Sequence, residues 1–188
     1  MRRTVLVLVV MVAALVVASG VAVAVTREGG PGNDVLIGTN GFDSLLGQAG
    51  NDTVVGLAGP DELWGGPGTD LMYGGPGEDF VQGDLIFTRQ AAKDVLYGGP
   101  GEDYVDGWRG NDVVSGGPGV DYTTGGPGED VIYGGDGDDW LATERSGGNL
   151  DEQRDKFYCG AGKDHYYADK NDYVSSSCEK KIVGGGAA

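Results

Sequence analysis

A nine-residue repeat dominates this sequence and limits what the chain can fold into. Residues 29–142 divide into twelve units of nine residues, with one six-residue insertion inside the seventh unit. Glycine occupies position 1 of every unit, aspartate occupies position 6 of every unit, and position 8 is apolar in every unit except for Thr123. A short fixed period is the signature of a solenoid, so we expect stacked coils rather than one globular core.

Glycine and acidic residues set the composition. The 188 residues include 38 glycines, and 29 acidic side chains against 13 basic ones give a formal net charge of -16. A chain this acidic repels phosphate groups, which excludes nucleic acid as a partner. Glycine adds no side chain to a core, so something other than apolar burial must stabilise the fold.

The repeat resembles the RTX, or hemolysin-type, calcium-binding nonapeptide, whose pattern is GGxGxDxUx. The unit at 74–82, GGPGEDFVQ, matches it in full, and the resemblance covers 114 of the 188 residues. It implies an all-β fold, a parallel β-roll or right-handed β-solenoid. In this roll the first six residues of a unit form a turn, the last three form a short strand, and two units make one coil.

The same resemblance implies where calcium binds, namely between the turns of neighbouring coils. The ligands would be main-chain carbonyls and the position-6 carboxylates, together with Asp164 of a degenerate repeat: Asp34, Asp43, Asp52, Asp61, Asp70, Asp79, Asp94, Asp103, Asp112, Asp121, Asp130 and Asp139. Calcium prefers six to eight oxygen ligands, and tight turns can offer several carbonyls to one ion. We expect glycine at positions 1, 2 and 4 to allow positive φ and close backbone approach.

The charge is concentrated in the repeats. Residues 29–142 carry 20 acidic and 3 basic side chains, whereas residues 143–188 carry 8 and 7. About eight calcium ions between neighbouring units would bring the array close to neutrality. Without metal the stacked carboxylates repel one another, so the sequence predicts that the chain folds when it binds calcium.

Odd and even units differ at position 7, which predicts two different outer faces. The odd units carry mostly β-branched residues there, whereas the later even units carry aromatic ones: Phe80, Tyr104, Tyr122 and Trp140. Coils stacked at about 4.8 Å let such rings pack in register. Two interpretations stay open for this aromatic row, which are packing between coils and a surface that binds an extracellular glycan or protein.

Residues 1–24 form a separate N-terminal segment. Arg2 and Arg3 precede an apolar run at 5–17, and small residues follow at 22–24, which is typical of a signal peptide. The longer stretch 5–25, interrupted only by Ser19 and Gly20, is also long enough for an uncleaved N-terminal anchor, the one case in which we expect contact with a membrane. Both interpretations place the rest of the chain in a secreted, extracellular or cell-surface location, after a short linker at 25–28.

The insertion at 84–93 is the main irregularity of the array. It lacks the turn glycines and contains Arg89 and Lys93, two of the three basic residues of 29–142. We expect a loop that bulges from one edge of the roll above a weakened calcium site. A binding role for Phe87 and Arg89 stays open, although surface loops tolerate such insertions without one.

Residues 143–188 are expected to form a loop followed by a cap that closes the end of the core. The segment 159–167, CGAGKDHYY, is a nonapeptide with cysteine in place of its first glycine. Cys159 and Cys178 are the two cysteines of the chain, and export favours a disulfide between them. This ending, a Cys-first repeat followed by a Cys-Glu pair, is similar to that of exported RTX-like proteins of actinobacteria.

No catalytic constellation stands out. His165 is the single histidine, and neither a Gly-x-Ser-x-Gly nor a His-Glu-x-x-His stretch is present. The sequence therefore predicts a protein that is not an enzyme, a calcium-binding roll with a structural or interaction role. The alternatives are a calcium-dependent adhesin or carbohydrate-binding module that uses the aromatic row and, less favoured, a fragment of a secreted hydrolase.

Overall fold

The computed structural model describes residues 24–85, 92–143 and 153–181, and their strands form two parallel sheets without any helix in these ranges. The nine-stranded sheet contains, in spatial order, β1 (Thr26–Glu28), β3 (Ser44–Leu46), β5 (Glu62–Trp64), β7 (Phe80–Gln82), β9 (Tyr104–Asp106), β11 (Tyr122–Thr124), β13 (Trp140–Ala142), β15 (His165–Tyr167) and β17 (Lys180–Lys181). The eight-stranded sheet contains β2 (Val35–Ile37), β4 (Thr53–Val55), β6 (Leu71–Tyr73), β8 (Val95–Tyr97), β10 (Val113–Pro118), β12 (Val131–Asp136), β14 (Lys156–Ala161) and β16 (Tyr173–Val174).

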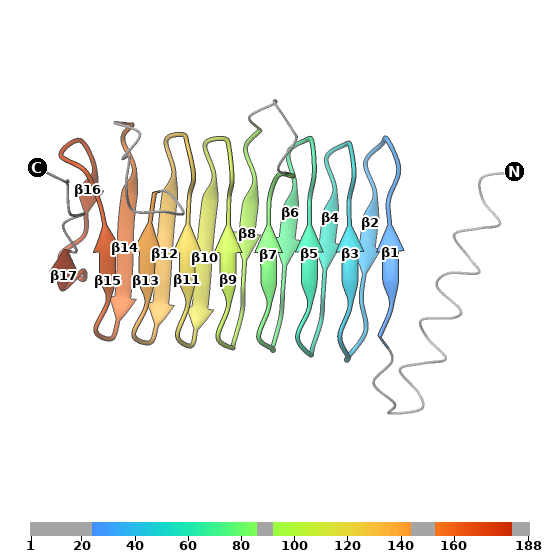
Figure 1. Ribbon diagram of the computed structural model, residues 1–188, viewed down its shortest axis with the longest axis horizontal. Coiled ribbons are helices and arrows are strands. Elements are labelled where there is room, and N and C mark those ends of the chain that lie inside the picture. The colour runs from blue at the N-terminus through green and yellow to red at the C-terminus, as the bar shows by residue number, and fades with distance from the viewer. Residues whose placement is uncertain (1–23, 86–91, 144–152, 182–188) are drawn as a thin grey trace, which may run out of the picture.

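Successive units alternate between the two sheets along the length of the roll (Figure 1). Strands of the same sheet pair in parallel and in register, so that Tyr122 lies beside Tyr104 in the preceding coil. The register survives the insertion, because Tyr104 also lies beside Phe80, although the inserted loop separates these two residues along the chain. The expected all-β parallel roll with two units per coil is therefore confirmed.

The side chains at position 8 form the core between the sheets. They point inward from every strand of the repeats, while their neighbours at position 7 stay at least partly exposed. The fully buried apolar residues of this row are Leu45, Val54, Leu63, Met72, Val81, Leu96, Val105, Val114 and Ile132. One apolar side chain in each unit makes a narrow core, and ordering the backbone of a whole unit costs more than that burial returns.

Thr123 is the polar member of this apolar row and gives a prediction. It is fully buried between Val105 and Leu141, and its Oγ1 finds no hydrogen-bond partner in the part of the chain that the structure describes. Replacing a buried, unsatisfied hydroxyl by a methyl group removes its desolvation cost. We expect Thr123→Val to raise the free energy of unfolding by about 1 kcal/mol in saturating calcium, measured by denaturant titration. Val105→Thr, the reverse change one coil away, should lower it, and two variants of equal stability would contradict this account.

Both ends of the roll extend beyond the twelve repeats. Residues 26–28, expected as part of a linker, form strand β1 and pair with β3. At the other end β14 to β17 continue both sheets through the segment expected as a cap. Phe157 and Cys159 are fully buried there, and the predicted disulfide between Cys159 and Cys178 is confirmed. The cap is thus built largely from further coils of the same roll.

Three of the sequence-based expectations concern residues that lie outside the described ranges. These are the signal peptide or anchor, apart from its last residue, the part of the insertion that contains Phe87 and Arg89, and most of the loop expected before the cap. Within the described ranges, no helix is long and apolar enough to cross a membrane.

Candidate metal centre

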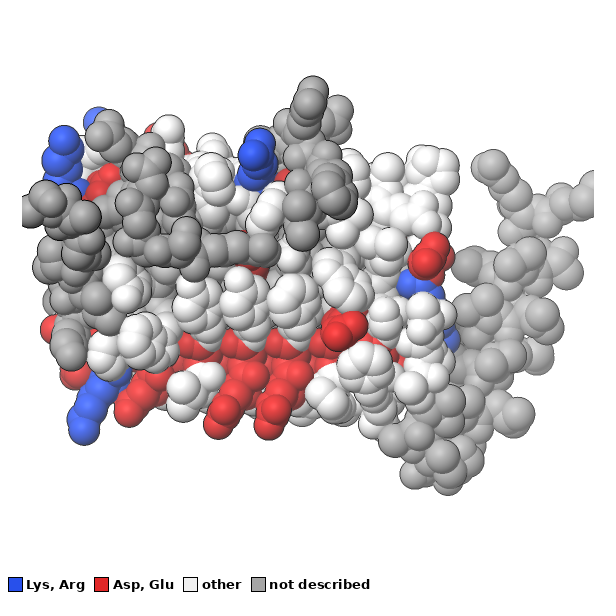
Figure 2. Space-filling model, in the orientation of Figure 1, with Lys and Arg blue, Asp and Glu red and all other residues white. Residues whose placement is uncertain are grey.

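The position-6 aspartates form two rows, one along each turn edge of the roll. Even units contribute Asp43, Asp61, Asp79, Asp103, Asp121 and Asp139, and odd units contribute Asp34, Asp52, Asp70, Asp94, Asp112 and Asp130. All of them except for the terminal Asp34 are at most 3% exposed. Figure 2 shows a continuous acidic band along one edge of the roll. The structure thus brings the predicted ligands together within each row.

Each row is held by a repeated hydrogen bond. The backbone N–H of one aspartate donates to Oδ1 of the aspartate in the next coil, as Asp61 does to Asp79 and Asp94 does to Asp112, both at 2.8 Å. The same bond recurs along both rows from coil to coil. It fixes the orientation of each carboxylate and leaves the second oxygen to point elsewhere.

That second oxygen, Oδ2, is buried and finds no hydrogen-bond partner in the described ranges for nine of these aspartates and for Asp164 of the degenerate repeat. They are Asp52, Asp61, Asp70, Asp79, Asp94, Asp103, Asp112, Asp121, Asp139 and Asp164. A buried carboxylate oxygen without a partner is costly, and a row of them is sustained only by a compensating cation or by protons. Sequence reasoning identified all ten residues.

Burial raises the pKa of these carboxyls, while the N–H donated from the preceding coil lowers it in part. The pKa is about 6 for Asp79 and Asp121, about 7 for Asp61, Asp70, Asp103 and Asp139, about 8 for Asp94 and about 9 for Asp112. For most of them the charge of neighbouring carboxylates adds to the increase. The metal-free rows therefore favour protonation near neutral pH.

These raised pKa values predict how pH acts on the metal-free chain. Since the folded roll holds protons up to about pH 6–9 that the unfolded chain releases near pH 4, the free energy of unfolding falls as pH rises through this window. In chelator we therefore expect β-sheet circular dichroism to increase as pH is lowered from 8 to 4. Calcium affinity should fall over the same range, because protons compete for the carboxylates. A chelated chain that loses structure on acidification to pH 4 would refute the assignment.

Glycine at position 1 allows close approach of the backbone, as expected, but the atoms that approach it were not identified from the sequence. None of these glycines has a positive φ, so the expected conformational role is wrong at this position. A Cβ on Gly65 would instead lie 2.3 Å from Asp70 Oδ2 and 2.6 Å from the Gly83 carbonyl oxygen of the next coil. Nine units repeat this convergence of a carboxylate and a glycine carbonyl oxygen over the position-1 glycine. Position 1 is glycine because a side chain would fill the space that the two oxygens face.

Glycines at positions 2 and 4 let the turns stack closely, as expected. Gly66 has φ of +105°, and a Cβ there would lie 2.1 Å from the Gln48 carbonyl oxygen of the preceding coil. Gly101 has φ of +156°, and its Cβ would collide with the Gly77 carbonyl oxygen. At Gly66 and Gly101, glycine therefore serves both the backbone conformation and the contact between the turns, although Gln48, Leu57 and Trp108 adopt positive φ at position 2 of other units.

The donors in this arrangement suit calcium. Each of these nine places over a position-1 glycine offers one carboxylate oxygen and one carbonyl oxygen, which are hard ligands of the kind that calcium prefers. The described residues contain no group of three or more His, Cys, Asp or Glu side chains arranged to hold a metal. This follows from the repeat, since each unit brings one row carboxylate, and main-chain oxygens are the other donors that the turns offer. The residues present fit an ion held between coils.

Comparison with known families agrees with this geometry. The model of the RTX calcium-binding nonapeptide repeat matches four segments, 28–62, 46–81, 91–123 and 115–145, which together span more than half of the chain. The chain belongs to the RTX repeat family. Its repeats are calcium-binding repeats, which is what the carboxylate rows indicated. No curated protein matches the chain.

The RTX aspartate rows continue past the matched segments into the cap. Asp130 N–H donates to Asp155 Oδ1 at 2.7 Å, Asp139 N–H to Asp164 Oδ1 at 3.0 Å, and Asp155 N–H to Asp172 Oδ1 at 3.1 Å. Sequence analysis placed Asp164 in the row but missed Asp155 and Asp172. The available signal was local, since each immediately precedes a strand whose second residue is buried or half-buried. The sequence around them has lost the nine-residue spacing of the repeat.

Two further buried carboxylates of the RTX roll lie outside the position-6 pattern. Asp84 and Asp106 are both fully buried, and the charge of Asp84 raises the pKa of Asp70, Asp94 and Asp112. Asp84 belongs to the insertion, where a weakened site was expected. The row nevertheless passes through this unit unchanged, because Asp70 N–H donates to Asp94 Oδ1 at the usual 2.8 Å.

The aromatic row predicted as a surface-binding candidate forms a stack on the outer face of the nine-stranded sheet. Phe80 and Tyr104 stack at 5.2 Å between ring centroids, Tyr104 and Tyr122 at 5.1 Å, and Trp140 stacks on His165 at 4.5 Å. The rings line one groove together with the acidic side chains Glu62, Glu78 and Glu102. Since stacked rings cover one another's faces, packing between coils accounts for much of this row.

Proposed function

We propose that this RTX chain is an exported roll whose folding depends on calcium and which serves a structural or interaction role. The observation that carries the proposal is the set of ten buried Oδ2 atoms without hydrogen-bond partners in the described ranges. An unpaired buried carboxylate destabilises a fold, whereas the same group stabilises it when it holds a cation. Calcium binding and folding are then one event.

The proposed ligands are the position-6 carboxylates and the position-1 carbonyl oxygens that meet over the glycines. Asp70 with Gly83 in the odd row and Asp61 with Gly74 in the even row are two examples. When bound, calcium supplies the positive charge that the rows lack. The aspartates hold it through Oδ2 while Oδ1 keeps its hydrogen bond to the preceding coil. Charge balance favours about eight ions per chain.

An extracellular location is supported by the disulfide between Cys159 and Cys178. Disulfides persist in oxidising compartments and are rare where thiols are kept reduced. Millimolar calcium is also typical of the extracellular environment of calcium-stabilised modules. The chain would thus remain unfolded where calcium is scarce and fold after export.

Isothermal titration calorimetry on the chelator-stripped chain tests the proposal. We expect about eight calcium ions per chain, with heat that develops alongside the change in circular dichroism. Asp61→Asn and Asp70→Asn, one in each row, should each weaken binding, whereas the exposed Glu129→Gln should leave it unchanged. Fewer than about four ions, or binding without folding, would contradict the proposal.

A surface-binding role for the aromatic groove is the second candidate. Phe80, Tyr104, Tyr122 and Trp140 all line this groove. A row of rings from successive coils favours an elongated ligand. The mutual stacking of the rings leaves few free faces for a sugar. Glycan-array binding in calcium that is lost in the Tyr104→Ala and Tyr122→Ala variants would favour an adhesin or carbohydrate-binding module.

A further inference from the structure

The last repeat meets the cap at a place that resembles the candidate calcium sites but has one different member. A Cβ on Gly134 would lie 2.6 Å from Asp139 Oδ2 and 2.5 Å from the carbonyl oxygen of Cys159. At the nine comparable places the carbonyl oxygen belongs to a glycine of the repeats. Here it belongs to a disulfide-bonded cysteine of the cap. We call the group formed by Gly134, Asp139 and Cys159 the junction site.

The carboxylate of the junction site has the same burial and hydrogen bonding as the carboxylates of the rows. Asp139 is fully buried, and its Oδ2 has no hydrogen-bond partner in the described ranges. Its backbone N–H donates to Asp164 Oδ1 at 3.0 Å, which ties it to the next coil. The junction site therefore presents one carboxylate and one carbonyl oxygen toward the same space, as the sites within the repeats do.

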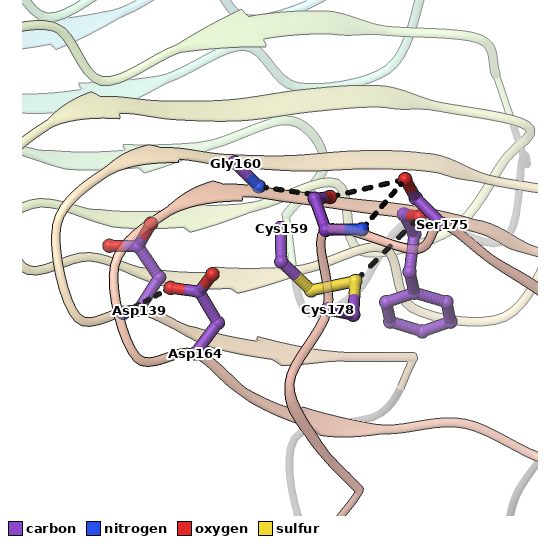
Figure 3. Close-up of a disulfide and its surroundings, with 8 residues drawn as sticks. Asp139, Cys159, Gly160, Asp164, Ser175 and Cys178 are labelled. Atoms are coloured by element: carbon purple, nitrogen blue, oxygen red, sulfur yellow. Dashed lines mark hydrogen bonds between the residues drawn. A yellow bond between two sulfur atoms is a disulfide. The ribbon is translucent and has the colours of Figure 1, made fainter.

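The carbonyl of Cys159 is held from the side of the cap. Cys159 is fully buried and forms a disulfide with Cys178 (Figure 3). The N–H of Cys178 donates to the Ser175 carbonyl at 3.1 Å. Gly160 N–H donates to Ser177 Oγ at 3.3 Å. Strand β14, which contains Cys159, is followed in its sheet by the short strand β16. A terminal coil that packs against only one short strand on its outer side opens readily unless it is cross-linked.

We propose that Asp139 Oδ2 and the Cys159 carbonyl oxygen form part of a calcium site at the junction between roll and cap, and that the disulfide between Cys159 and Cys178 keeps the second oxygen in place. This inference rests on the proposed calcium binding of the repeats. Calcium at the junction and the intact disulfide then stabilise each other, and thermodynamic linkage makes the effect reciprocal. Calcium protects the disulfide from reduction, and the disulfide raises the affinity for calcium.

Reduction of this disulfide by a dithiol defines the chemistry of the test. A thiolate of dithiothreitol attacks one cysteine sulfur and forms a mixed disulfide, and its second thiol then closes the reagent into a ring. The reagent loses two electrons and two protons, and Cys159 and Cys178 each gain one of both. Calcium prefers oxygen ligands, so the new thiols do not replace the carbonyl as a calcium ligand.

The experiment measures the rate of reduction by dithiothreitol, in millimolar calcium and in chelator, by alkylation of free thiols and mass spectrometry. For the full chain we expect calcium to slow reduction at least tenfold. Asp139→Asn should lose most of this protection. Asp61→Asn is the matched control, because Asp61 lies in the same row and has the same buried, unpartnered Oδ2, but lies four coils before Asp139.

The control separates local from global protection. If Asp139→Asn and Asp61→Asn keep or lose protection equally, calcium acts through the whole fold and the junction site is refuted. If the unaltered chain folds with calcium but gains no protection, the inference fails while the proposed function stands. If calcium neither folds the chain nor protects it, the proposed function fails and the inference fails with it.

A second measurement tests the reciprocal effect, that of the disulfide on calcium binding. The double variant Cys159→Ala and Cys178→Ala keeps a Cβ at both positions and the carbonyl at residue 159. After circular dichroism has shown that it folds in saturating calcium, calorimetry should find one ion fewer, or one ion bound at least tenfold more weakly. If the variant does not fold, the unaltered chain reduced by dithiothreitol takes its place in the titration. Binding equal to that of the oxidised chain would overturn the inference.

Discussion

In excess chelator, the far-ultraviolet circular dichroism of the chain is expected to lose its β-sheet signal and to recover it when calcium is restored. The two rows place buried carboxylates in successive coils, at the spacing of about 4.8 Å that separates neighbouring strands. Their mutual repulsion adds to the cost of burying each one, and the net charge of -16 opposes compaction. The single apolar row at position 8 is too narrow to compensate, so removal of the cation should unfold the roll.

Magnesium provides the control for this result. It demands short, near-octahedral coordination and gives up its water reluctantly, so the main-chain carbonyls of these turns should not satisfy it. Refolding by calcium but not by equal magnesium would show that the oxygen geometry matters and not charge screening alone. A chelated chain at neutral pH with the same spectrum as the calcium-loaded chain would show that the fold does not depend on metal.

Gly65→Ala is expected to be among the most damaging single substitutions in the chain. The new Cβ would lie 2.3 Å from Asp70 Oδ2 and 2.6 Å from the Gly83 carbonyl oxygen. The Asp70 carboxylate is fixed through Oδ1, which accepts from the Asp52 N–H, and the Gly83 carbonyl accepts from the Gly66 N–H, both at 2.8 Å. The clash must displace the two oxygens that we assign to calcium. We expect the calcium concentration for half-folding to rise at least tenfold, with a loss of about 3 kcal/mol or more in stability at saturating calcium.

Gly32→Ala is the matched control for that change. A Cβ on Gly32 would have nothing within 4 Å, and its φ lies outside the left-handed region. The same substitution should therefore alter stability by less than about 0.5 kcal/mol. Similar losses in both variants would point to a general intolerance of alanine in the turns rather than to the space over position 1.

The repeat period predicted the architecture because each of its positions has one structural task. Position 8 points inward from the middle of a short strand, as Val105 does, and position 6 ends the turn, as Asp103 does. Both follow from local geometry, and both are uniform along the chain. The fold class and the two carboxylate rows could therefore be predicted without a structure.

What sequence analysis missed involves contact between coils. The role of Gly65 depends on the carbonyl oxygen of Gly83 in the next coil, and a consensus pattern for a single unit does not contain that contact. Asp155 was missed because the sequence before it departs from the nine-residue spacing of the repeat. In the degenerate repeat, position 1 is Cys159 and not glycine. A search for glycine at this position therefore does not reveal that the Cys159 carbonyl lies over Gly134 as glycine carbonyls lie over the earlier position-1 glycines.

The alternation of units between the two sheets restricts how the length of such a chain can change. Deleting a single unit would move every later strand to the opposite sheet, so that the aromatic side chains beyond the cut would face the other side of the molecule. Deleting a consecutive pair of units would shorten the roll by one coil and leave each face intact, since every strand pairs with the next but one along the chain. Insertions within a turn, such as the one between β7 and β8, escape this parity rule because the strands resume in register. Growth of the array by duplication should therefore proceed by whole coils, while loops of any length can be added at its edges.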